Sequence, residues 1–370
     1  MNGAAYLDHN ATTPLRPEAG RAVEAACAVA GNPSSAHRFG RAQRRVVEDA
    51  REQVARLVGA RPETVVFTSG GTEANALALS GSGRRRMLVS AIEHPSVLAA
   101  GPDAARIPVD GDGVVDLAAL EKMLAASAEP ALVSVMLANN ETGVIQPVAE
   151  IAALARRFGA VVHCDAVQAA GKISIDMRAL GVHLLSLSGH KFGGPMGTGA
   201  LIVDDAVPLA ALIRGGGQER GRRSGTENVP GIAGMGAAAD AARAGLDRFA
   251  RLAALRDDME TRILAAVPSA KIAGRGAARL PNTSCIALSG LAAETQVMAL
   301  DLAGVAVGSG AACSSGKTKA SPVLAAMGFD ADAAAGAIRV SLGWTTTAAD
   351  IESFRTAWTA LAVRARAAAA

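Results

Sequence analysis

Ser188-Gly189-His190-Lys191 ends an apolar run that starts at Leu184, and Gly193-Gly194-Pro195 follows closely behind it. Glycine and proline break helices, so this pattern predicts a strand that delivers its lysine to the loop at its carboxyl end. A second apolar run, 160–164, ends at Asp165 in the same manner. Polar side chains at the ends of neighbouring parallel strands are typical of the functional edge of an α/β sheet. The sequence therefore predicts that Lys191 and Asp165 share one edge.

An amine and a carboxylate at such an edge match the needs of pyridoxal phosphate (PLP). That cofactor requires a lysine for its Schiff base and an acid that keeps its pyridine nitrogen protonated. An ordinary ion pair between Lys191 and Asp165 on surface loops explains the same two residues. Taken alone, the pair leaves both interpretations open.

Composition and charge exclude several classes of protein. The chain has 370 residues, enough for two or three domains and a substantial core. Hydrophobic residues make up 50% but aromatic residues only 3%, so Ala, Val, Leu and Ile must build that core. The net charge is +3, and no basic block is longer than Arg84-Arg85-Arg86, which argues against binding to nucleic acid.

No apolar run reaches the length of a bilayer span, since the most suggestive one, 200–213, is interrupted by Asp204 and Asp205. Residues 1–8 lack the basic and apolar regions of a secretion signal. We therefore expect a cytoplasmic protein with no membrane segment.

The alternation of patterns predicts the fold class. From about residue 20 to 240, short apolar runs alternate with helical patterns, which indicates βαβ units and a mostly parallel sheet. A long Ala/Arg/Leu stretch, 238–266, has a helical pattern, and the strict alternation stops beyond it. We predict an α/β protein with a large domain at 20–240 and a smaller α+β domain built from 1–19 and 241–370.

Gly70-Gly71-Thr72-Glu73 lies between a predicted strand, 65–68, and a predicted helix. Free N–H groups at such a helix start, with the Thr72 hydroxyl, suit a phosphate. Thr72 acting only as a helix cap explains the pattern as well. Ser188 and His190 could donate to the same anion, which strengthens the phosphate interpretation.

Other polar residues follow predicted strands on the same edge. His94 precedes Pro95 and could stack on a planar cofactor or move a proton, although a polar loop residue is the plain alternative. Asn140 and Gln168 are uncharged donors suited to a phenolic oxygen. Arg339 lies inside an apolar strand pattern, where an unpaired guanidinium is costly. Its partner would be a substrate carboxylate or a structural Asp or Glu.

The four cysteines are far apart and form no CxxC pair, which argues against a metal site and against a disulfide framework. Cys27, Cys164 and Cys285 lie in apolar patterns and are expected in the core. Cys313 lies in a run of small and polar residues, with lysines nearby that favour a thiolate. It is a candidate nucleophile, and an inert loop cysteine is the alternative.

Several motifs in order along the chain resemble one family. They are Tyr6-Leu7-Asp8-His9-Asn10-Ala11-Thr12-Thr13, Gly31-Asn32-Pro33-Ser34-Ser35, Thr68-Ser69-Gly70-Gly71-Thr72-Glu73, Glu93-His94, Asn139-Asn140-Glu141-Thr142-Gly143, Asp165-Ala166-Val167-Gln168, Ser188-Gly189-His190-Lys191 and Arg223-Ser224-Gly225-Thr226. Together they resemble the cysteine desulfurases, which are PLP enzymes of the class V aminotransferase group. The resemblance runs from residue 6 to about 343 and implies the aspartate aminotransferase-like fold of PLP-dependent transferases.

The resemblance implies a role for each matching position. Lys191 would carry PLP, Asp165 would pair with the pyridine nitrogen, Gln168 with the ring oxygen, and His94 would stack on the ring. The phosphate would be bound by Gly71, Thr72, Ser188, Gly189 and His190, joined by Thr226 from the other subunit of a homodimer. Asn140 would contact the cofactor and, with Arg339, hold the carboxylate of L-cysteine. Cys313 would accept the sulfur as a persulfide while alanine leaves.

The extended loop from Cys313 to Pro322 resembles the subgroup that serves iron–sulfur assembly, including housekeeping and nitrogen-fixation enzymes. An iron–sulfur scaffold or another sulfur-acceptor protein is the implied partner. The chain departs from that subgroup at its end, which follows soon after Trp358, so docking of a scaffold through a longer tail is not implied. A selenocysteine lyase or an aminotransferase on the same fold is the alternative activity, and a persulfide carrier without catalysis is a third.

Overall fold

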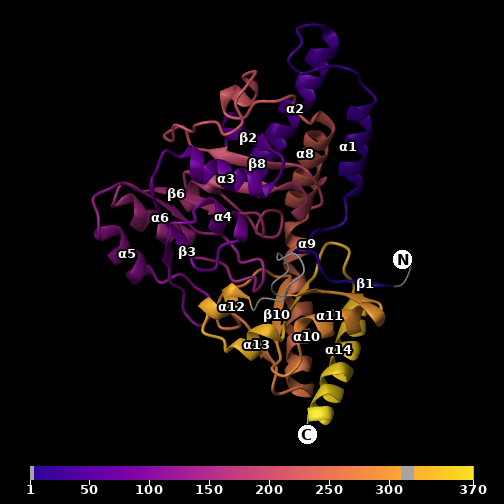
Figure 1. Cartoon of the computed structure of the whole chain (residues 1–370). Coiled ribbons are helices and arrows are strands. Elements are labelled where there is room, and N and C mark those ends of the chain that lie inside the picture. The colour runs from indigo at the N-terminus through magenta and orange to yellow at the C-terminus, as the bar shows by residue number, and fades with distance from the viewer. Residues whose placement is uncertain (1–3, 310–320, 370) are drawn as a thin grey trace.

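The fold was analysed in a computed structural model, which describes residues 4–309 and 321–369 (Figure 1). Its largest sheet has seven strands in the order β2-β8-β7-β6-β5-β3-β4. Neighbouring strands are parallel except around β8, which is antiparallel to both β2 and β7. The expected α/β class with a mostly parallel sheet is confirmed. The strands of this sheet are β2 (Val65–Thr68), β3 (Arg86–Ser90), β4 (Ala105–Ile107), β5 (Ala131–Ser134), β6 (Val161–Asp165), β7 (Leu184–Ser188) and β8 (Gly199–Val203).

Helices cover both faces of this sheet, because alternate residues of each buried strand point to opposite sides. On one face, Val66 and Leu184 pack with Leu77 of α3. On the other, Val65 and Leu185 belong to the core that α2, α6 and α8 complete. The helices of this part are α1 (Pro17–Cys27), α2 (Arg38–Leu57), α3 (Gly71–Gly81), α4 (Pro95–Ala100), α5 (Leu117–Ala125), α6 (Val148–Arg156), α7 (Met177–Leu180) and α8 (Val229–Ala244), with short 3-10 turns at Pro62–Thr64, Gly189–Lys191 and Gln218–Gly221.

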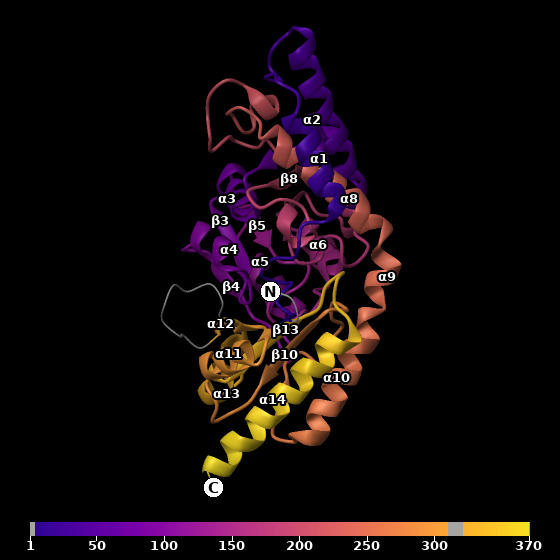
Figure 2. The same cartoon turned by 90° about the vertical axis from the view of Figure 1, so that its right-hand side faces the viewer.

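The rest of the chain surrounds a four-stranded antiparallel sheet of order β12-β13-β10-β9, beside a two-stranded parallel pair, β1 and β11. Helices α10 and α14 run side by side along it, as the two views show (Figures 1 and 2). Trp358 and Phe354 of α14 are fully buried there. The elements are β1 (Ala5–Tyr6), α9 (Leu246–Ala250), α10 (Leu252–Ala266), β9 (Lys271–Ile272), β10 (Thr283–Ala287), α11 (Ala293–Leu302), β11 (Val305–Ala306), β12 (Gly308–Ser309), α12 (Pro322–Ala326), α13 (Ala331–Ala335), β13 (Ala337–Ser341) and α14 (Ala348–Ala369).

The stretch 238–266 is almost entirely helical, as its pattern predicts, but it is interrupted twice. It contains the end of α8, then α9 and α10, with junctions at Gly245 and Arg251. Glycine weakens a helix interior, which accounts for the first break. The domain boundary expected at residue 240 falls inside α8, so helix rather than a flexible linker crosses it.

Across 4–309 and 321–369, no helix combines the length and apolar character needed to cross a bilayer.

Candidate active site

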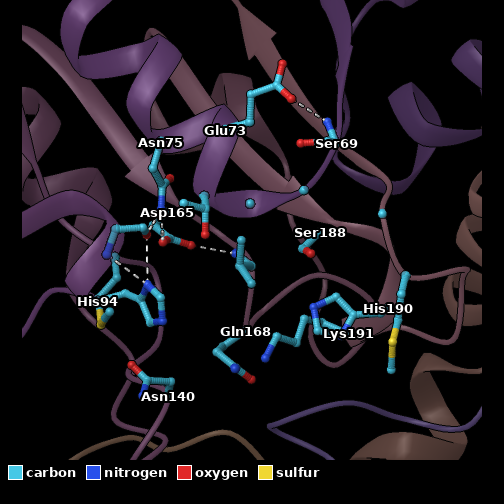
Figure 3. A pocket seen from close by; sticks show the side chains of 18 of the residues that line it. Ser69, Glu73, Asn75, His94, Asn140, Asp165, Gln168, Ser188, His190 and Lys191 are labelled. Carbon is cyan, nitrogen blue, oxygen red and sulfur yellow. Dashed lines mark hydrogen bonds between the residues drawn. The ribbon is translucent and has the colours of Figure 1, made fainter. Parts of the chain in front are cut away.

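The carboxyl ends of β5, β6 and β7 and the start of α3 surround a cavity of about 420 Å³ (Figure 3). The structure brings most of the residues expected at the site to its wall, although they come from separate loops. Those that line it are Gly71, Thr72, His94, Asn140, Asp165, Gln168, Ser188, His190 and Lys191. The sheet therefore gathers these groups because each strand ends at the same edge.

The Asp165 carboxylate is 5% exposed and held on both oxygens. Its Oδ1 accepts from the backbone N–H of Val167 at 2.9 Å, and its Oδ2 accepts from Asn75 Nδ2 at 2.7 Å. Asn75 lies on α3, one turn after Gly71, and no local feature of the sequence distinguishes it. These two hydrogen bonds fix the orientation of the carboxylate, which lines the cavity.

His94 is joined to the same group through a short chain of polar contacts. Asn75 Nδ2 also donates to Ser96 Oγ at 2.9 Å, and that hydroxyl lies 2.8 Å from His94 Nδ1. Burial lowers the pKa of His94, while the Asp165 charge raises it and the Lys191 charge lowers it. Near neutral pH the ring is therefore favoured as a neutral base on the cavity wall.

Lys191 follows β7 in a 3-10 turn and reaches back to the N-terminal segment. Its Nζ donates to the carbonyl oxygens of Asn10 at 2.6 Å and Ala11 at 2.8 Å. These contacts hold the amine at the cavity, where it could be released to a carbonyl group. Asn10 was not among the predicted site residues, because its position beside Lys191 depends on packing between segments 181 residues apart.

The start of α3 forms a close-fitting cradle. A Cβ added at Gly71 would lie 2.8 Å from Val167 Cγ2, and one at Gly199 would lie 2.5 Å from the backbone of Gly70. The first-turn N–H groups of α3 have no acceptors within their own helix, and Ser188 and His190 line the same region. Burial and the Lys191 charge lower the pKa of His190 to about 4, so it is a neutral donor or acceptor at neutral pH.

The donor set fits PLP. An amine, a fixed carboxylate and an anion cradle are the three groups that hold its aldehyde, pyridine and phosphate. The remaining expected cofactor residues lie outside the wall of this cavity. A Cβ added at Gly189 would clash with Thr198 Oγ1, and Thr226 is exposed on the loop before α8.

Arg339 does not line this cavity in the structure. It is 3% exposed on β13 and pairs with Asp8, with Nη2 to Oδ1 at 2.7 Å. Its Nη1 donates to the carbonyl oxygen of Asn140 at 3.1 Å, which connects it to the cavity wall. The sequence left a substrate carboxylate and a structural Asp or Glu open as the partner of Arg339. The structure shows the second of these, Asp8.

Of the three cysteines expected in the core, two are buried and one is exposed. Cys164 and Cys285 are buried, and burial raises the pKa of both thiols, that of Cys285 to about 12. Cys27 is exposed at the last residue of α1, so its assignment to the core was wrong. The apolar pattern around it includes the outer side of the helix, where alanines face solvent. Cys313, the candidate nucleophile, lies outside the described residues.

Comparison with known proteins agrees with this geometry. The model of the aminotransferase class-V family matches residues 5–354. A cysteine desulfurase of Cereibacter sphaeroides is 49% identical over 94% of this chain and 92% of that protein, and an IscS-like cysteine desulfurase of Mycobacterium tuberculosis is 41% identical over 99% and 98%. The solved structure of a NifS-like protein from Rickettsia africae ESF-5 superposes with a TM-score of 0.89, at 37% identity over 97% of this chain and 99% of that one.

The chain therefore belongs to the aminotransferase class-V family of PLP-dependent enzymes. Within that family, three relatives that it matches over more than nine-tenths of their length are cysteine desulfurases.

Proposed function

We propose that this protein is a cysteine desulfurase, which removes sulfur from L-cysteine and releases L-alanine. The observation that carries the proposal is the convergence of Lys191, Asp165 and His94 on one cavity. The names of the relatives support the choice of L-cysteine as substrate.

PLP, when bound, supplies an electron sink for the bond that breaks at the substrate. Lys191 would attach the cofactor, Asp165 would hold its pyridine nitrogen and Gln168 its ring oxygen. Its phosphate would lie against Gly71, Thr72, Ser188, Gly189 and His190, joined by Thr226 of the partner subunit. His94 would cover the ring, and Asn140 would contact both cofactor and substrate.

Side chains of the protein would carry out the proton transfers and bind the substrate carboxylate. His94, together with the Lys191 amine once it is released from the backbone oxygens of Asn10 and Ala11, would accept and return protons at the substrate carbons. The Arg339 guanidinium would bind the substrate carboxylate, with Asn140 beside it. Burial lowers the pKa of His94, which favours the neutral ring that can take a proton.

The sulfur step would use Cys313. Its thiolate attacks the sulfur of the substrate, the new S–S bond forms as the C–S bond breaks, and the carbon keeps the electron pair and takes a proton. Alanine leaves, and the persulfide stays on Cys313 for transfer to an acceptor.

We also propose a homodimer in the cytoplasm that passes sulfur to an iron–sulfur scaffold or another acceptor protein. Thr226 is exposed, and Leu212 and Ile213, which precede it, expose 47% and 44% of their surface. A second copy would bury these apolar side chains and bring Thr226 to the other cavity. A single mass near 37 kDa in multi-angle light scattering would contradict the dimer.

The direct test of the activity is an assay with L-cysteine and dithiothreitol that measures alanine and sulfide together. A desulfurase forms the two products in equal amounts. Consumption of cysteine only when a keto acid is added would instead indicate an aminotransferase, and alanine without an equal amount of sulfide would contradict the desulfurase.

A further inference from the structure

Lys172 is a buried lysine next to the site that the proposed mechanism does not use. It is 4% exposed, and no ion pair joins it to a carboxylate within 4–309 and 321–369. Its Nζ instead donates to two side-chain amide oxygens, Asn10 Oδ1 at 2.7 Å and Gln168 Oε1 at 2.8 Å. Burying a lysine without a counterion costs folding free energy, so we looked for a role of this side chain at the site.

The backbone turn after β6 determines the position of the Lys172 amine. After β6 the backbone makes a short helical turn, in which Lys172 N–H donates to the carbonyl of Ala169 at 3.0 Å. Lys172 thereby lies one turn beyond Gln168 and on the same side. Gly171 has φ of 73°, and a Cβ there would lie 2.8 Å from Phe192 Cβ, so only glycine fits the residue that delivers Lys172.

The contacts of Lys172 determine which way the Gln168 amide faces. Because Oε1 is occupied by the lysine, Nε2 is directed to the carbonyl of Asn10, to which it donates at 2.9 Å. An amide nitrogen has two hydrogens, so one N–H remains for a second acceptor. Gln168 lines the cavity, and that acceptor would be a group bound there (Figure 3).

The same amine orients Asn10. Its Oδ1 accepts from Lys172, which leaves its Nδ2 to donate to Thr283 Oγ1 at 2.9 Å. The backbone carbonyl of Asn10 in turn accepts from Lys191 at 2.6 Å. One buried amine therefore connects the residue beside Lys191 with the amide at the cavity wall.

Lys172 can act as a hydrogen-bond donor in its neutral form. Burial lowers the pKa of Lys172 well below its ordinary value, and the positive charges of Lys191 and Arg339 lower it further. A neutral amine still has two N–H groups, and two acceptors are present at hydrogen-bond distance.

We propose that Lys172 is a positioning residue of this site, which acts by holding the Gln168 and Asn10 amides so that Gln168 presents N–H rather than C=O to the ring oxygen of the cofactor. The proposal rests on the cofactor role proposed for Gln168. Lys172 itself touches neither cofactor nor substrate in this account.

The test is a double-mutant cycle on the holoenzyme with Lys172→Met, Gln168→Leu and the two combined. Two quantities are measured without substrate: the dissociation constant for PLP, and the pH midpoint of the visible absorbance of the bound cofactor. Each single variant should weaken PLP binding by about three- to tenfold, the worth of one neutral hydrogen bond. Each should also raise the pH midpoint, because the ring oxygen loses a donor that favours its anionic form.

The decisive measurement is PLP binding by the double variant, Lys172→Met with Gln168→Leu. If Lys172 acts through Gln168, the double variant binds PLP no more weakly than Gln168→Leu alone. Losses that simply add, or a Lys172→Met enzyme with the wild-type pH midpoint, would overturn the proposal. A Gln168→Leu enzyme that binds PLP like the wild type would instead reject the cofactor role of Gln168. Should Lys172→Met not fold, Lys172→Gln, which also removes the amine but keeps a polar group, takes its place in the cycle.

Asn282→Ala is the matched control. Asn282 Nδ2 donates to the same Asn10 Oδ1 at 3.1 Å, and within the described residues Asn282 forms no hydrogen bond with Gln168. It should leave the pH midpoint of the cofactor unchanged. A shift equal to that of Lys172→Met would assign the effect to Asn10 alone and overturn the role of the Gln168 contact.

Discussion

Asp8 occupies only part of the Arg339 guanidinium. Its Oδ1 accepts from Nη2 at 2.7 Å, whereas Arg339 Nε is buried and has no hydrogen-bond partner within the described residues. A carboxylate bound in the bidentate manner would use Nε and Nη2 together. The ion pair therefore leaves Arg339 with an unused donor, which a substrate carboxylate can satisfy.

Arg339→Lys should raise the KM for L-cysteine by about ten- to a hundredfold, because lysine keeps the charge but loses the planar fork. The visible absorbance of bound PLP should not change. Asp8→Asn is the control, since it breaks the same ion pair but leaves the guanidinium in place. Equal rises in KM for both variants would mean that Arg339 serves only the ion pair. The measurement is steady-state sulfide release.

Lys191→Ala should purify without the visible absorbance of covalently held PLP, and it should release no sulfide from L-cysteine. Lys271→Ala, which removes an exposed lysine on β9, should resemble the wild type in both respects. A Lys191→Ala protein that keeps the absorbance band would refute the assignment of this lysine.

Asn75→Leu should weaken PLP binding by about tenfold, because Asp165 Oδ2 loses the donor at 2.7 Å that holds the carboxylate in place. Asn75→Asp should be worse, since it places a second carboxylate against Asp165. Titration of the purified apoprotein with PLP gives both dissociation constants. Binding by Asn75→Asp as tight as the wild type would show that this contact does not support the cofactor.

Glu93 provides a pH test of stability. Burial raises its pKa from 4.5 to about 8, although Ser90 donates to it at 2.6 Å. Between these two pH values the folded protein holds a proton that the unfolded chain has lost, so the free energy of unfolding falls as pH rises. The slope is about 1.4 kcal/mol per pH unit for one group.

Glu93→Gln cannot lose that proton and keeps an oxygen for Ser90 and for the N–H of Met136. Relative to the wild type, it should therefore gain stability steadily from pH 6 to pH 8 in urea unfolding. A stability difference that is the same at both pH values would show that Glu93 does not ionise in this window.

The sequence could predict the parts of the site that follow from strand ends. Asp165, Lys191 and His94 close apolar runs, and parallel strands carry their ends to one edge, so convergence required no knowledge of distant contacts. The glycines between β2 and α3 also suggested an anion site, although a helix cap at Thr72 explained the same pattern.

Other parts depend on contacts that leave no local pattern. Asn75 and Asn10 look like ordinary amides, and Lys172 like a surface lysine, until packing buries them beside Asp165, Lys191 and Gln168. Asp8 became the partner of Arg339 only because the N-terminal segment crosses to β13, 331 residues away. Within 238–266 the composition favours helix. Because that pattern extends on both sides of Gly245, it did not reveal the interruption there.

The most direct test of the proposed function uses Cys313→Ala beside the wild type, with L-cysteine and dithiothreitol, and measures alanine, sulfide and bound PLP in the same samples. We predict equal alanine and sulfide from the wild type. The variant should retain full PLP absorbance and release no sulfide. A Cys313→Ala enzyme that still releases sulfide at the wild-type rate would contradict the account.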